Sequence, residues 1–77
     1  MNQEQINCLK SAIETEMLDS YLREPLCPDD MLEHFIGSET FDEILEGFNV
    51  KCKTLRNKMY DHAKAWAFAL HHVHGKA

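Results

Sequence analysis

Glycine and proline are scarce in this sequence, with three Gly and two Pro among 77 residues. An all-β sandwich needs many turns, so this scarcity argues against that class of fold. The chain also has no long apolar run, no signal peptide and no lipidation motif, and we expect no association with a membrane. Its three cysteines form no Cys-x-x-Cys pair and are odd in number. This usage is typical of a reduced protein and predicts a cytoplasmic location.

The chain is short enough for one domain only, and we expect residues 1–77 to form a single helical domain. The net charge is −5, but residues 1–49 hold −10 and residues 50–77 hold +5. Such asymmetry is typical of a surface that binds a polyanion, or of self-association between the two halves. It is equally typical of surface charge that keeps a small protein in solution.

Apolar residues recur at spacings of three and four through most of the chain, which is the period of an amphipathic helix. A first helix is predicted over residues 3–23, because the residue before Pro25 is pushed out of helical geometry. A second, short helix is predicted to begin at Pro28, since proline suits the first helical position. Gly37 is the expected C-terminal stop of this second helix.

Thr40 and Glu43 fit a capping box and predict that a third helix begins at about Phe41. From there the apolar spacing of three and four continues to Val73. One interpretation is a single helix of some 33 residues, and the other breaks the helix at residues 47–49, where turn-forming residues occur. No segment has the two-residue period of a strand. The sequence therefore predicts an all-α domain of three or four helices, with the N-terminal helix packed along the C-terminal one.

Residues 41–59 have the pattern of a helix-turn-helix. Leu45, Val50 and Leu55 would form the small internal core that sets the crossing of its two helices. Asn49 would take the left-handed backbone conformation in the turn, which asparagine tolerates better than other non-glycine residues.

Within this pattern, residues 54–59 read Thr-Leu-Arg-Asn-Lys-Met and resemble the recognition helix of the factor-for-inversion-stimulation (Fis) type. The resemblance implies a DNA-binding protein. Lys and Arg side chains suit phosphates and guanine edges, Asn suits adenine, and Thr suits phosphate or the thymine methyl. The residues predicted to contact DNA are Lys51, Lys53, Thr54, Arg56, Asn57 and Lys58. The alternative is that these side chains form the solvated face of an amphipathic helix.

The segment of residues 63–73 is apolar on nearly every side, which is more than a single intramolecular partner would cover. We therefore expect a homodimer held mainly by residues 59–73. The residues predicted at its interface are Met59, Ala63, Trp66, Leu70 and Val73. The alternative is that the whole stripe is intramolecular core.

Two functions from different classes remain open. The first is a small, non-enzymatic DNA-binding regulator of transcription, of a size and charge that suit a phage or other mobile element. The second is an acidic helical interaction module, an inhibitor or adaptor, that binds the basic surface of a larger protein. No arrangement of catalytic residues or phosphate-binding glycines can be assigned, and we predict neither an enzyme nor a cofactor. His71, His72 and His74 lie close in sequence, but nothing completes a four-ligand site, so no metal is predicted.

Overall fold

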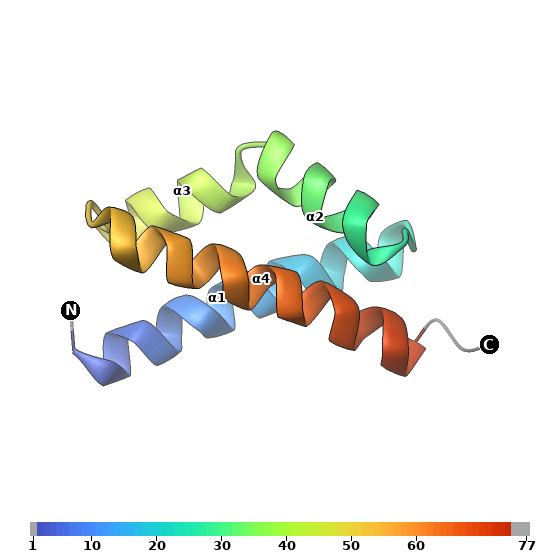
Figure 1. The fold of residues 1–77 in the computed structure, drawn as a ribbon, viewed down its shortest axis with the longest axis horizontal. Coiled ribbons are helices and arrows are strands. Elements are labelled where there is room, and N and C mark those ends of the chain that lie inside the picture. Colours follow the sequence, from blue (N-terminus) through green and yellow to red (C-terminus); the bar gives the residue numbers. More distant parts are fainter. Residues whose placement is uncertain (1, 75–77) are drawn as a thin grey trace.

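The computed structural model describes residues 2–74, which fold into four helices joined by short loops (Figure 1). The helices are α1 (Gln3–Arg23), α2 (Pro28–Gly37), α3 (Thr40–Gly47) and α4 (Lys53–His74). No strand occurs among these residues, and the predicted all-α fold is confirmed. The predicted bounds of the first two helices are also confirmed.

Local sequence signals explain both ends of α1 and the start of α2. The Gln5 N–H donates to the Asn2 side chain at 2.8 Å, and the Asn2 N–H donates to the Gln5 side chain at 3.0 Å. This reciprocal capping satisfies backbone donors that the first turn of a helix leaves free. Glu24 has an extended backbone, as expected of a residue before proline. Pro28 occupies the first position of α2.

The start of α3 differs from the predicted capping box. Thr40 is the first residue of the helix and does not cap it, and its hydroxyl lies 3.0 Å from that of Ser38. Glu39 precedes the helix with a φ of 67°, in the left-handed region. The physical reason is that only two residues separate α2 from α3, and the chain needs a left-handed residue to turn sharply there.

The break between α3 and α4 decides between one long C-terminal helix and two. α3 ends at Gly47 and α4 begins at Lys53, so the continuous helix of some 33 residues is wrong. Asn49 has a φ of 59°, which confirms its predicted left-handed conformation. The Val50 N–H donates to the Leu45 carbonyl at 2.9 Å and ties the turn to the end of α3.

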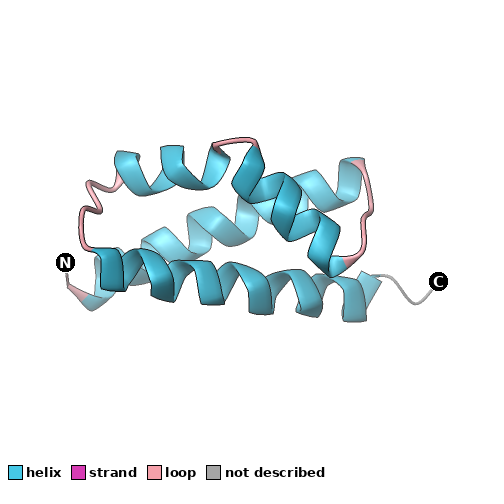
Figure 2. Cartoon of the chain, turned by 45° about the horizontal axis from the view of Figure 1, so that its top comes forward, coloured by secondary structure: helices cyan, strands magenta, loops and turns pink. Residues whose placement is uncertain are grey.

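The four helices pack so that α4 is covered by both α1 and α2. Figure 1 shows α1 and α4 running in the same direction and crossing, and Figure 2 shows α2 and α3 together on one side of this pair. The prediction that the first helix packs along the last is confirmed. The buried core takes residues from all four helices: Leu9, Ile13, Met17, Tyr21, Met31, Leu32, Phe35, Phe41, Leu45, Met59, Ala63, Ala67 and Leu70.

Candidate interaction surfaces

The six residues predicted to contact DNA lie together in the loop before α4 and in its first turns. Each of them has an exposed side chain. The predicted internal core of the turn is also in place, since Leu45 is buried and Val50 and Leu55 pack against the core. The structure therefore brings the predicted residues to one end of the molecule. The resemblance to a Fis-type recognition helix stays a prediction.

Arg56 differs from the other five because it is held by α3. Its guanidinium Nη1 lies 2.6 Å from Asp42 Oδ1, and its Cζ lies 5.3 Å from the centre of the Phe41 ring. The pair is half exposed, with 46% of the Arg56 side chain and 51% of the Asp42 side chain accessible. The Asp42 carboxylate offsets the positive charge of the guanidinium and occupies part of its donor capacity, which weakens its attraction for a phosphate or a guanine edge.

The opposite charge is concentrated on what we term the acidic surface, formed by α2, α3 and their flanking loop residues (28–49). These 22 residues contain no lysine and no arginine. Among residues 2–74, Asp42 is the one carboxylate of this surface that forms an ion pair. The seven carboxylates of the acidic surface, all exposed, are Asp29, Asp30, Glu33, Glu39, Asp42, Glu43 and Glu46.

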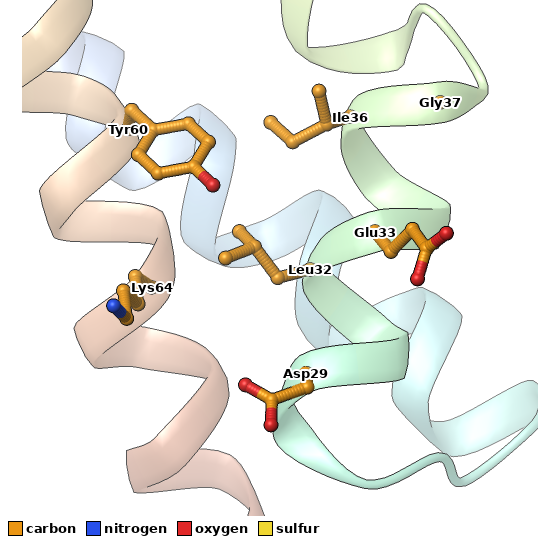
Figure 3. A pocket seen from close by; sticks show the side chains of 7 residues that line it. All are labelled: Asp29, Leu32, Glu33, Ile36, Gly37, Tyr60 and Lys64. Carbon is orange, nitrogen blue, oxygen red and sulfur yellow. The ribbon is translucent and has the colours of Figure 1, made fainter.

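A groove of about 430 Å³ lies between α2 and α4, at the edge of the acidic surface. Figure 3 shows Leu32 and Ile36 of α2 pointing toward the ring of Tyr60 on α4. The Tyr60 ring stands edge-on to that of Phe41, with 6.5 Å between ring centres. The residues that line the groove are Asp29, Leu32, Glu33, Ile36, Gly37, Tyr60 and Lys64.

This groove was not predicted from the sequence because Tyr60 lies outside the repeating apolar stripe of α4. Its neighbour Met59 belongs to that stripe and is buried. Tyr60 points to the side of the helix that faces α2, where 42% of its surface is accessible. The one signal in the sequence is that a large aromatic residue, Tyr60, directly follows Met59, which is a position of the apolar stripe.

The residues predicted at a dimer interface are placed differently from expectation. Met59, Ala63 and Leu70 are at most 4% exposed and lie in the core of the single chain. They are therefore not available to a second copy, and this assignment is corrected. The physical reason is that α4 has two intramolecular partners, α1 and α2, where the prediction allowed for one. Trp66 is partly buried and Val73 is 69% exposed, and the homodimer itself stays a prediction.

Two polar groups on α4 have distinctive surroundings. The indole N–H of Trp66 is buried without a hydrogen-bond partner among the described residues. His62 Nε2 lies 2.7 Å from Glu14 Oε2 and links α4 to α1 at the edge of the core. Both groups belong to the packing between helices, and neither is part of a cluster that resembles a catalytic site.

Cys52 lies immediately before α4, and its thiol is exposed. Hydrogen bonds from the backbone N–H groups of Leu55 and Thr54 lower the pKa of this thiol, and the positive charge of Lys58 adds to the effect. The other two cysteines are also free and exposed.

Metal-binding and membrane-spanning features are absent from the described part of the chain. Residues 2–74 contain no group of three or more His, Cys, Asp or Glu side chains arranged to hold a metal ion. His71 and His72 are exposed, and the side chain of His74 lies outside the described residues. None of the helices in this part is both long enough and apolar enough to cross a membrane.

Comparisons of the chain with protein-family models, with curated proteins and with solved structures give no match. The features of the molecule that bear on its function are therefore the two charged surfaces and the groove between α2 and α4.

Proposed function

We propose that this protein is an interaction module whose acidic surface binds a basic surface of a larger protein. The observation that carries this proposal is the set of seven exposed carboxylates on 22 residues that contain no lysine or arginine. A surface on which charges of one sign are concentrated creates a potential that attracts an oppositely charged partner and favours its correct orientation.

Two further features support the proposal. Six of the seven carboxylates form no ion pair within residues 2–74, so they are free to meet a cation from outside. The helices that present them are anchored by buried side chains, among them Phe35 of α2 and Phe41 of α3, whose rings stand edge-on at 5.8 Å. A surface held in place before binding loses less conformational entropy when a partner docks.

A deca-lysine peptide tests the charge component of this proposal. We expect it to bind the protein at low salt and to shift the backbone NMR signals of α2 and α3 before those of α1. Asp30→Asn combined with Glu43→Gln should weaken binding several-fold. The control is Glu4→Gln combined with Glu16→Gln, which removes the same charge from exposed positions on α1. When the variants are compared at about 0.15 M salt, exposed charges are screened over about 8 Å, so the control should bind almost as the wild type does.

Equal losses in the two variants would show that only net charge matters, and no localised acidic site would be left to propose. Absence of binding at low salt would reject the proposal outright.

We propose DNA binding by the start of α4 as a second candidate function. Five exposed side chains without an ion pair in the described chain support it: Lys51, Lys53, Thr54, Asn57 and Lys58. Lys58 also lines a groove of about 460 Å³ together with Lys10 of α1, which adds a cation from a second helix, and with one carboxylate, that of Asp61. The nearby carboxylates of α3 oppose the approach of phosphates, so this candidate ranks second.

Fluorescence anisotropy with a short DNA duplex at several salt concentrations tests the second candidate. Lys53→Ala and Lys58→Ala should each weaken binding and reduce the slope of log K against log salt by about one. A wild-type protein with no salt-dependent binding to DNA would reject it.

A further inference from the structure

We infer that the groove between α2 and α4 binds one large apolar side chain of a basic amphipathic helix. The inference rests on the proposed function, because the acidic surface would attract the partner and the groove would then select it. The occupant is defined by two chemical features, an apolar anchor and flanking cations, and each follows from one part of the groove.

The floor of the groove is apolar and firmly supported. Leu32 is 7% exposed and belongs to the core, while Ile36 packs against it. Tyr60 forms the opposite wall (Figure 3). Its ring also contacts the ring of Phe41 edge-on. A volume of about 430 Å³ falls within the range of sites that bind small ligands, so it has room for one large apolar side chain. An apolar side chain seated here would displace water from the exposed parts of Ile36 and Tyr60.

The rim of the groove is charged in an asymmetric way. Asp29 and Glu33 are four residues apart on α2 and both line the groove, but Figure 3 shows the carboxylate of Asp29 pointing toward α4 and that of Glu33 pointing away from it. Neither forms an ion pair among residues 2–74. Lys64 stands on the opposite edge, on α4. A ligand helix with a cation on one side of its anchor would pair with Asp29 and turn its other side toward Lys64.

A second copy of this chain does not satisfy these requirements. Its own cations are concentrated around residues 51–58, but the apolar residue among them, Leu55, packs against its own core. The large apolar side chains that are exposed elsewhere, including Leu22, Phe68 and Val73, lie outside that basic segment. A basic helix from a different protein therefore fits the groove better.

Gly37 provides a way to close the groove without disturbing the fold. A Cβ at this position would meet no atom within 4 Å, and the backbone φ is not positive. Gly37→Leu should therefore fold, and because Gly37 is one of the residues that line the groove, the added side chain should narrow this end of it. Gly47→Leu is the matched control, because Gly47 also ends a helix and its Cβ would also meet no atom within 4 Å.

The test uses a synthetic peptide with the sequence Leu-Lys-Lys-Leu-Leu-Lys-Leu repeated twice, and a second peptide of equal charge with serine in place of leucine. Isothermal titration calorimetry should show the leucine peptide binding the full chain at least about tenfold more tightly, as expected of a buried anchor. Gly37→Leu should abolish this difference, and Gly47→Leu should keep it. Asp29→Asn should weaken binding of the leucine peptide about two- to threefold, and Lys64→Gln should strengthen it by a similar factor.

The outcomes separate the inference from the proposed function. If the two peptides bind the wild type equally, the groove takes no apolar anchor and the inference is overturned, while the acidic surface keeps its proposed role. If the leucine peptide binds more tightly but Gly37→Leu has no effect, the anchor lies elsewhere and the inference is again overturned. If neither peptide binds, the proposed function fails as well. Circular dichroism of each variant confirms that its helices are intact.

Discussion

Glu39 is a position where the fold forces the backbone of an ordinary residue into the left-handed region, with a φ of 67°. Its carbonyl accepts a hydrogen bond from the Glu43 N–H at 2.9 Å and so begins α3. A left-handed residue with a Cβ costs about 1–2 kcal/mol, which glycine avoids. Glycine also has more conformational freedom in the unfolded chain than glutamate, and this offsets about 0.5–1 kcal/mol of the strain energy that is relieved. We therefore expect Glu39→Gly to raise the free energy of unfolding by about 0.5–1 kcal/mol.

Thermal unfolding followed by circular dichroism measures this gain. For a domain of this size, 1 kcal/mol shifts Tm by about 4–8 °C, so the expected increase is about 2–8 °C. Glu39→Gln is the control, because it removes the charge from the acidic surface but keeps a Cβ in the strained position. A lower Tm for Glu39→Gly would refute the argument from strain. An equal rise for Glu39→Gln would attribute the gain to relief of repulsion between carboxylates.

Three further predictions follow from the core, the thiol and the ion pair. Leu70→Asp should yield an unfolded chain and not a folded monomer. The reason is that a buried unpaired charge costs several kcal/mol, and a domain of this size is stable by only about 4–12 kcal/mol. Sedimentation combined with circular dichroism distinguishes the two outcomes. Because its pKa is lowered, the Cys52 thiol should form thiolate and react with iodoacetamide at lower pH than the thiol of N-acetylcysteine, as mass spectrometry of a mixture of the two would show. A double-mutant cycle on Arg56 and Asp42 should give a coupling of about 0.2–1 kcal/mol that declines with salt, and a salt-independent value would contradict an exposed pair.

Features fixed by one or two neighbouring residues were predictable from the sequence. Pro25 and Pro28 set the end of α1 and the start of α2 through constraints that act on the adjacent backbone alone. Asn49 marked the break before α4 for the same reason, because its tolerance of the left-handed region is a property of its own side chain. The start of α3 was predicted to within one residue, but its capping was not predictable in this way, since the left-handed Glu39 depends on how closely α2 and α3 meet.

Features that depend on the arrangement of several helices could not be predicted. An apolar stripe shows how wide the buried face of α4 is, but not whether one or two helices of the same chain cover it. The assignment of Met59, Ala63 and Leu70 to a dimer interface was wrong for that reason. The groove beside Tyr60 was missed because it exists only when α2 lies next to α4.

The two charged surfaces meet at the ion pair of Asp42 with Arg56, so a single substitution there tests both proposed functions with opposite expected signs. Asp42→Asn removes one of the seven carboxylates of the acidic surface and releases the guanidinium toward the basic start of α4. Binding of deca-lysine should weaken, because the negative potential of the acidic surface falls. Binding of a DNA duplex should strengthen, because a carboxylate that repels phosphates is replaced by a neutral amide and the Arg56 guanidinium is released.

Titrations with both probes at one salt concentration measure the two changes on the same protein. A change of the same sign for both ligands would contradict an electrostatic origin. It would indicate that Asp42 acts mainly by positioning α3 against α4, a role that Arg56→Gln should reproduce in full. If the electrostatic argument is right, Arg56→Gln should weaken DNA binding and leave binding of deca-lysine unchanged or stronger, since it removes a cation and frees a carboxylate. The signs of these four changes therefore decide whether the pair marks a boundary between two binding surfaces or serves only to join two helices.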